Sequence, residues 1–268
     1  MGVDTDIKNT IKLLNSEDVS GYGNIYPCTN EDLRSIYSSV DFENKDVLSV
    51  LASGDHVFMS FINGAKSVSS FDINKLALYY FYLRLWTIKY HGTYYPEPFL
   101  DSEYVSYLLN DVRVMEPREN QAYEYWQKLL KKIEPYEFGL LFFVGSNYLH
   151  LSDKELNLLR ERLYYNDVKF HNIDISGDFN IDKKFDVVVT SNIVDWLSSG
   201  GCSFKPYMNN LDKLLKKDGF VLSSNLGTSN YEPEEKDIFS EKFEFKKLID
   251  DNADKNWNVV AFQYKKTK

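Results

Sequence analysis

The hydrophobic positions form a clear pattern from about residue 46, where an apolar run is followed by a turn, a helix and a second run. The first run, Val47–Leu51, is almost entirely apolar, as expected of a strand buried on both faces of a parallel sheet. The small-residue turn Ala52–Asp55 ends it, and a helix of one or two turns is predicted to follow and to end at Asn63–Gly64. Residues 67–71 form a second predicted strand with Asp72 at its carboxyl end. This order is half of a nucleotide-binding βαβ unit, and Asp72 follows the glycine of the turn at about the usual spacing.

The pattern returns in the last third of the chain. Three more strands are predicted there, and a helix that ends at Asp218–Gly219 precedes the last of them. These strands are residues 168–174, 185–190 and 220–224. Residues 242–250 and 257–266 alternate as an antiparallel pair does, or as a short helix and a closing strand. The pattern predicts an α/β fold, namely a Rossmann-like doubly wound, mostly parallel sheet with an antiparallel closing strand and a helical insertion.

Helical signals divide the chain into a lead-in, a domain and an insertion. Residues 1–40 are predicted to form an N-terminal helical or lid segment. Residues 41–268 are predicted to form the Rossmann-like domain, interrupted by a helical insertion at about 93–150.

Local caps predict where several helices begin and end. Asn74 is a suitable cap for a long helix that His91–Gly92 closes, and Ser152–Glu155 is a capping box that opens another helix. Residues 138–145 are ambiguous between the end of a buried helix and a strand, since their periodicity fits both.

A glycine-containing loop with two tyrosines precedes the first predicted strand. Tyr22 and Tyr26 lie in this loop, and Thr29 is predicted to cap a helix with an acidic first turn. The loop either folds over the mouth of a ligand site as a lid or is an ordinary surface loop. The two tyrosines are therefore candidate substrate or lid residues.

Charge and composition narrow the class of ligand. The formal net charge of −9 repels phosphate backbones, so we expect no nucleic-acid partner and a small-molecule acceptor instead. The two cysteines are far apart, which fits a reducing compartment, and the four histidines show no metal-ligand spacing, so no metal is predicted. No stretch has the length and apolarity of a membrane span or the form of a signal peptide, so a cytoplasmic location is expected.

Three features together resemble the class I S-adenosylmethionine-dependent methyltransferases. They are the Ser53-Gly54-Asp55 turn with Asp72 behind it, the acidic Asp174 after the third strand, and FDVVVTSNIVDWL at 185–197 followed by LLKKDGFVLSSN at 214–225. The resemblance covers roughly residues 40–265.

The first motif departs from the usual family pattern. That pattern has an acidic residue and two or three glycines, whereas VLSVLASGD keeps only Gly54 and has Ser49 at the acidic position. This variant resembles the branch that includes the betaine-lipid 3-amino-3-carboxypropyl transferases and related bacterial proteins. The departure leaves open which group of the sulfonium would be transferred.

The resemblance implies a cofactor site for S-adenosyl-L-methionine (SAM) at the ends of four strands. The turn would face the methionine part, two carboxylates would bind the ribose and the adenine, and the end of the fourth strand would line the reacting face. The implied residues are Ser53, Gly54 and Asp55 for methionine; Asp72 for the ribose and Ile73 for the adenine ring; Asp174 for the adenine amino group, with Ile175 alongside it; and Ser191 and Asn192 for the reacting face.

The implied activity is that of a SAM-dependent transferase, most simply a methyltransferase. The protein's main task would be to position donor and acceptor, with a general base needed only for a protonated nucleophile. Asp55, His56, Tyr26 and Asp195 are candidates for that base, and the sequence singles out none of them.

Three alternatives stay open. The same cofactor can donate its 3-amino-3-carboxypropyl group, and a protein with so altered a first motif can bind SAM without turnover. An NAD-dependent oxidoreductase would use the same first βαβ half, but the chain lacks G-x-G-x-x-G there.

Overall fold

A computed structural model describes most of the chain, in two compact units. The described residues are 2–15, 25–94, 101–111, 120–142, 149–199, 204–225, 243–250 and 260–267. The first unit consists of Met1–Asn30, Leu51–Asp55 and Asp72–Asp167, and the second of Glu31–Val50, His56–Phe71 and Val168–Lys268. The domain boundaries expected from the sequence stay a prediction.

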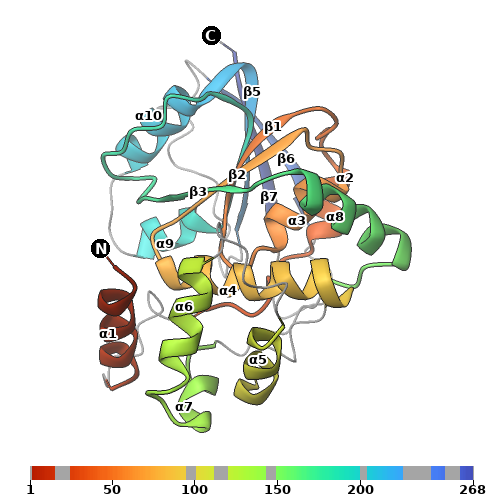
Figure 1. The fold of residues 1–268 in the computed structure, drawn as a ribbon. Coiled ribbons are helices and arrows are strands. Elements are labelled where there is room, and N and C mark those ends of the chain that lie inside the picture. Colours follow the sequence, from red (N-terminus) through yellow and green to blue (C-terminus); the bar gives the residue numbers. More distant parts are fainter. Residues whose placement is uncertain are drawn as a thin grey trace. The chain divides into compact units, whose positions relative to one another are not determined.

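The second unit is built on a seven-stranded sheet of order β3-β2-β1-β4-β5-β7-β6 (Figure 1). Its strands are β1 (Asp46–Val50), β2 (Ser67–Asp72), β3 (Lys169–Asn172), β4 (Phe185–Ser191), β5 (Leu215–Asn225), β6 (Phe243–Asp250) and β7 (Val260–Lys266). β1 pairs in parallel with β2 and β4, and β4 with β5, whereas β7 is antiparallel to both β5 and β6. The predicted fold class is confirmed, and residues 242–266 contain the antiparallel pair rather than a helix and a strand.

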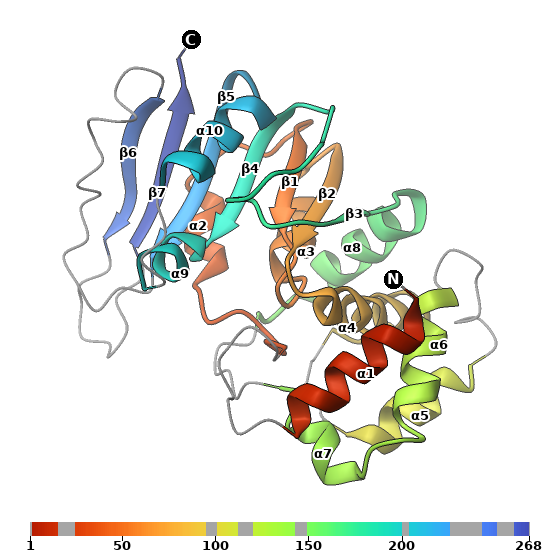
Figure 2. The ribbon, with the colours of Figure 1, turned by 90° about the vertical axis from the view of Figure 1, so that its left-hand side faces the viewer.

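Helices cover both faces of this sheet (Figure 2). α9 (Ile193–Ser199) and α10 (Phe204–Leu214) lie on one face, and α2 (Leu33–Ser38) and α3 (Asp55–Ile62) on the other. Val47, Leu48, Val187 and Val188 are therefore fully buried. Burial on both faces explains why β1 and β4 are apolar runs rather than alternating strands.

Two predicted boundaries in the second unit are wrong. α2 begins at Leu33, and its cap is Asp32 rather than Thr29, because the Asp32 carboxylate accepts the Ser35 N–H. α10 ends at Leu214 and β5 begins at once, so Asp218–Gly219 does not end the helix. Asp218 instead has a φ of 63° at a register shift between β4 and β5.

Helices make up most of the first unit. They are α1 (Val3–Leu14), α4 (Lys75–Trp86), the π-helical turn η1 (Thr87–His91), α5 (Ser102–Leu109), α6 (Asn120–Leu129), α7 (Pro135–Gly139) and α8 (Asp153–Tyr165). Aromatic side chains join three of them, since the Tyr79 and Tyr125 rings stack at 4.0 Å and the Tyr125 hydroxyl lies 2.7 Å from that of Thr10. The 16% aromatic content is thus partly core packing.

The predicted caps of this unit are confirmed. Asn74 accepts the Leu76 N–H at the start of α4, and Ser152 and Glu155 form the capping box of α8. Gly92, with a φ of 68°, ends η1. The ambiguous stretch 138–145 contains the end of α7 and an isolated bridge between Phe142 and Ile25, and 143–148 lie outside the described residues.

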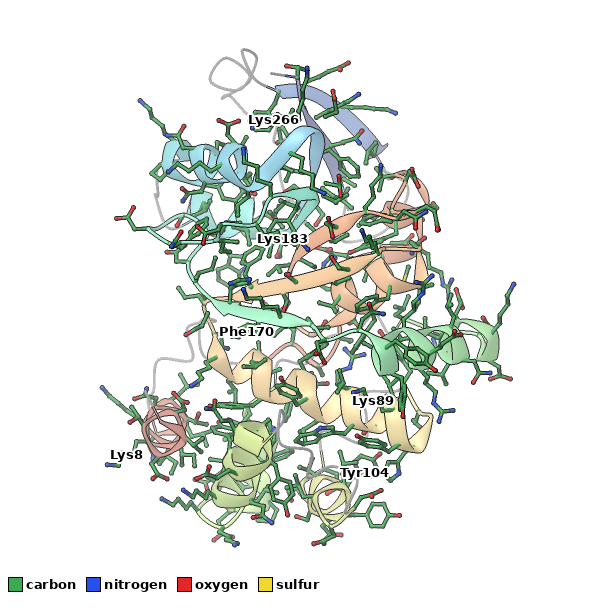
Figure 3. The ribbon with its side chains drawn as sticks, turned by 45° about the horizontal axis from the view of Figure 1, so that its top comes forward. Lys8, Lys89, Tyr104, Phe170, Lys183 and Lys266 are labelled. Carbon is green, nitrogen blue, oxygen red and sulfur yellow. The ribbon has the colours of Figure 1, made fainter. Side chains whose placement is uncertain are left out.

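Lysines tie together the amino-terminal ends of the central strands. Lys216 Nζ donates to Asp46 at 2.8 Å and to Asp186 at 2.9 Å, and Lys183 Nζ, labelled in Figure 3, lies 3.1 Å from the other Asp46 oxygen. These ion pairs are partly exposed, so each adds little stability. They lie at the opposite end of β4 from Ser191, and we assign them to strand alignment.

Ser70 on β2 offers a test of the sheet's packing. It is fully buried in register with Ser49 on β1, and its hydroxyl has no hydrogen-bond partner among the described residues. The Ser49 hydroxyl, in contrast, donates to Val50 O at 2.9 Å. We expect Ser70→Ala to raise the free energy of unfolding by about 1 kcal/mol in urea titrations, and Ser49→Ala to give no gain. A clear loss of stability in Ser70→Ala would contradict this.

Candidate functional site

The turn after β1 is held in an unusual backbone conformation. Ala52 has a φ of 45° and Gly54 a φ of 90°, and the Gly54 N–H donates to Leu51 O at 2.6 Å. A left-handed alanine is uncommon and costs about 1–2 kcal/mol. Such strain is often found where a turn presents its backbone to a ligand.

Exchanging alanine and glycine at positions 52 and 54 is expected to have opposite effects on stability. Gly54→Ala should lower the free energy of unfolding by about 1–2 kcal/mol, because a side chain is strained at a φ of 90°. Ala52→Gly relieves the same kind of strain but adds chain entropy, so we expect a gain below about 1 kcal/mol. Thermal unfolding of the two variants checks the signs, and equal losses in both would contradict the assignment.

A buried ion pair supports this turn. Asp55 Oδ1 lies 2.8 Å from Arg84 Nη1 and also accepts a hydrogen bond from the Tyr94 hydroxyl. Asp55 Oδ2 accepts from Ser53 Oγ at 2.8 Å and from the Thr29 N–H at 2.7 Å. Burial alone would raise the pKa of Asp55, but Arg84 and these hydrogen bonds hold it below its ordinary value. Both carboxylate oxygens are thus engaged inside the protein.

Arg84 links the pair to the turn's backbone. Its guanidinium donates to Ser53 O at 2.7 Å and lies 4.8 Å from the centre of the Tyr94 ring. Sequence reasoning missed both residues. The available signal was a charged residue inside the otherwise apolar stripe of α4, a position that a solvated arginine does not take.

Asp72 is tied to the same turn. Its carboxylate accepts the Ala52 N–H at 2.9 Å and the Asn74 N–H at 2.8 Å. Burial raises the pKa of Asp72 to about 6, although these backbone donors act to lower it. Ile73 beside it is 55% exposed, which is unusual for an isoleucine.

A second buried carboxylate lies in the other unit. Glu31 Oε1 accepts hydrogen bonds from Ser191 Oγ and Ser224 Oγ, both at 2.5 Å, while its Oε2 lies 2.9 Å from His56 Nε2. The Tyr37 hydroxyl donates to His56 O at 2.9 Å. Burial would raise the pKa of Glu31, but His56 and the two serines hold it below its ordinary value.

The residue at the end of β4 has a strained backbone. Ser191 has a φ of 51°, and the pairing of β4 with β5 shifts register just before it. Ser191 and Asn192 are both partly exposed. Strain and a register shift at the end of a central strand are typical of functional positions.

The loop after β3 is fixed by one side chain. Asn210 of α10 donates from Nδ2 to Ile175 O at 3.0 Å and to Gly177 O at 2.8 Å. Asp174 is exposed, and one of its oxygens accepts the Ser176 N–H and hydroxyl. Ile175 is buried, with 3% exposed. β3 ends at Asn172, so Asp174 follows the strand rather than ending it.

The predicted site residues fall into both units. The first contains Ser53, Gly54, Asp55, Asp72 and Ile73, and the second contains Asp174, Ile175, Ser191 and Asn192. Their roles toward a ligand stay predictions.

Of the two candidate lid tyrosines, the structure describes only Tyr26. Tyr22 lies outside the described residues. Tyr26 is partly buried, and this burial raises the pKa of its hydroxyl.

No group of three or more His, Cys, Asp and Glu side chains among the described residues could hold a metal ion. Within the same residues, no helix has the length and apolarity to cross a membrane.

No protein-family model matches the chain, and no curated protein matches it. Solved methyltransferases are similar to it in structure at low identity. The N-methyltransferase NodS from Bradyrhizobium japonicum, in complex with S-adenosyl-L-homocysteine, has 10% identity and a TM-score of 0.43 over 98% of this chain and 99% of that one.

Two more solved structures are of the same kind. A TehB-like SAM-dependent methyltransferase from Corynebacterium glutamicum has 11% identity and a TM-score of 0.41 over 98% of this chain and 100% of that one. A ribosomal protein L11 methylase from Lactobacillus delbrueckii has 14% identity and a TM-score of 0.39 over 88% and 76%. At TM-scores below 0.5, these likenesses carry no argument about function.

Proposed function

We propose that the chain is a SAM-dependent transferase, and most simply a methyltransferase that acts on a small-molecule acceptor. The observation that carries the proposal is Asp72, a partly buried carboxylate that ends β2 and accepts the Ala52 N–H of the strained turn after β1. An acidic residue at this position of a Rossmann-like sheet binds ribose hydroxyls. The net charge of −9 argues against a nucleic-acid acceptor.

The residues of each unit fit parts of this cofactor. In the first unit, the Ser53-Gly54-Asp55 turn would face the methionine end. The Gly54 N–H is bonded to Leu51 O and the Asp55 carboxylate is engaged, so the Ser53 N–H would be the donor of the turn to the cofactor. Asp72 would accept the ribose hydroxyls, and the exposed Ile73 would pack on the adenine.

In the second unit, Asp174 would bind the adenine amino group. The contacts from Asn210 to the carbonyls of Ile175 and Gly177 support this, because they fix the loop that carries Asp174. Ser191 and Asn192 would line the reacting face. When bound, the cofactor supplies an activated carbon for displacement. The protein's contribution is to orient the two reactants and exclude water.

Calorimetric titration of the full chain with SAM and with S-adenosyl-L-homocysteine (SAH) tests the proposal. We expect both to bind with submillimolar dissociation constants. Failure of both would refute the cofactor assignment, and binding of a nicotinamide cofactor instead would favour the oxidoreductase alternative.

The by-product identifies the transferred group. Methyl transfer leaves SAH, whereas 3-amino-3-carboxypropyl transfer, to which the Ser53-Gly54-Asp55 variant points by resemblance, leaves 5′-methylthioadenosine. Mass spectrometry of reactions with a panel of small amines, thiols and hydroxyl compounds distinguishes the two. Tight binding without either by-product would favour a non-catalytic SAM-binding protein.

A further inference from the structure

The two oxygens of the Glu31 carboxylate face different groups. One oxygen faces His56 of α3, and the other faces the hydroxyls at the ends of β4 and β5. Glu31 is 3% exposed and His56 2% exposed, so solvent screens this charge little. Because its pKa is held below the ordinary value, Glu31 is a carboxylate at neutral pH. One of its two oxygens, Oε1, is therefore directed toward Ser191 and Ser224.

The two serines differ in what they can do with that charge. Ser224 is 2% exposed, so its hydroxyl is confined to the interior. Ser191 is partly exposed, and its hydroxyl donates to Glu31 at 2.5 Å, with Asn192 Oδ1 a more distant acceptor at 3.4 Å. A serine oxygen that donates its hydrogen still has lone pairs to offer. Hydrogen bonding to a carboxylate also makes that oxygen more negative.

The position of Ser191 suits a ligand. β1 and β4 are adjacent in the sheet, and the strand order reverses between them. Ligands of open α/β sheets bind beyond the carboxyl ends of the strands at this point. The φ of 51° at Ser191 is a strain that the contact with Glu31 helps to maintain.

We propose that Ser191 binds the positive sulfonium of the cofactor through its hydroxyl oxygen, and that Glu31 is the positioning residue that orients this hydroxyl. This inference rests on the proposed function. It means that the chain distinguishes charged SAM from its uncharged product SAH by electrostatics at the end of β4, and so favours the substrate over the product.

The test compares two dissociation constants in each variant by calorimetry of the full chain. The measured quantity is the ratio of the dissociation constant of SAH to that of SAM. Ser191→Ala should lower this ratio about fivefold by weakening SAM while leaving SAH nearly unchanged. A purely structural role would weaken both ligands equally and leave the ratio as it is in the unsubstituted protein.

Ser224→Ala is the matched control, because it removes the other hydroxyl from the same Glu31 oxygen without removing the exposed one. It should leave the ratio unchanged. Glu31→Gln should lower the ratio as Ser191→Ala does, with circular dichroism to check folding. If Glu31→Gln does not fold, the comparison of Ser191→Ala with Ser224→Ala still tests the inference.

An unchanged ratio in Ser191→Ala, or an equal fall in Ser224→Ala, would overturn the inference while leaving the proposed function in place. Failure of the unsubstituted chain to bind either ligand would instead refute the proposed function.

Discussion

An Arg84→Met variant is expected to lose about 3–5 kcal/mol of folding free energy, because it leaves the Asp55 carboxylate buried without its cation. Both side chains are inaccessible to solvent, so water cannot replace the lost partner. The substitution also removes the hydrogen bond from the guanidinium to Ser53 O. We therefore expect Arg84→Met to disorder the turn after β1 as well as to destabilise the unit. Urea unfolding measures the loss.

A double-mutant cycle separates the ion pair from the rest of the cluster. Asp55→Asn in the Arg84→Met background removes the unpaired charge, so the double variant should be more stable than Arg84→Met alone. Recovery should be partial, because an asparagine offers one acceptor oxygen where Ser53, Thr29 and Tyr94 now donate to two.

Arg160 provides the matched control. It lies on α8 in the same unit and is exposed, so Arg160→Met should change the free energy of unfolding by no more than about 0.5 kcal/mol. A loss below about 1 kcal/mol in Arg84→Met would show that solvent reaches Asp55 and that the pair does not hold the turn.

Local signals explain which parts of the fold could be predicted. The apolar runs at 47–51 and 185–190 are β1 and β4 because strands buried on both faces leave that pattern. Asn74 and Ser152 act through neighbours within three residues, so their caps could be read directly. In contrast, Asp32 rather than Thr29 caps α2, because the helix begins only at Leu33 and the Asp32 carboxylate accepts the Ser35 N–H.

The sequence predicts the start of β5 too late, because a contact with a distant strand determines it. Residues 215–219 continue a helical pattern, but Leu215 pairs with Phe185 of β4. This pairing across the sheet overrides the local preference.

The candidate site depends still more on contacts between distant residues. Glu31 and Ser191 are 160 positions apart, and the sequence presents Glu31 only as an acidic residue near a helix start. Asp55 and Arg84 are likewise joined only by the fold. Asp72 could be identified because it ends a strand, and the order of apolar runs and turns in the sequence is enough to locate the end of that strand. Its role toward the ribose stays a prediction.

The affinity for SAM and SAH is expected to fall as the pH drops through about 6, the pKa to which burial raises Asp72. The charged carboxylate accepts hydrogen bonds from the ribose hydroxyls, and a proton competes with them. One pH unit below the pKa, about nine-tenths of the protein is protonated at this group, so the dissociation constant should be about tenfold higher at pH 5 than at pH 7.5. Calorimetry at several pH values measures this profile.

Unfolding does not account for such a loss of binding. The pKa of Asp72 is raised in the folded state, so this group's contribution to stability grows as the pH falls from 7 toward 4. The pKa values of Asp55 and Glu31 are lowered, so their contributions are lost only as the pH falls through those lowered values. The interval from pH 7.5 to 5 lies above them.

Asp72→Asn is the control for other titrating groups. It removes the charge and the proton-binding site, so the variant should bind more weakly at pH 7.5, by about 1.5–3 kcal/mol for each charged hydrogen bond lost. Its affinity should also be nearly independent of pH. Any other group that titrates in this interval acts in both proteins. If the affinity of the variant therefore depends on pH as steeply as that of the unsubstituted chain, the titrating group is not Asp72, and Asp72 does not bind the ribose.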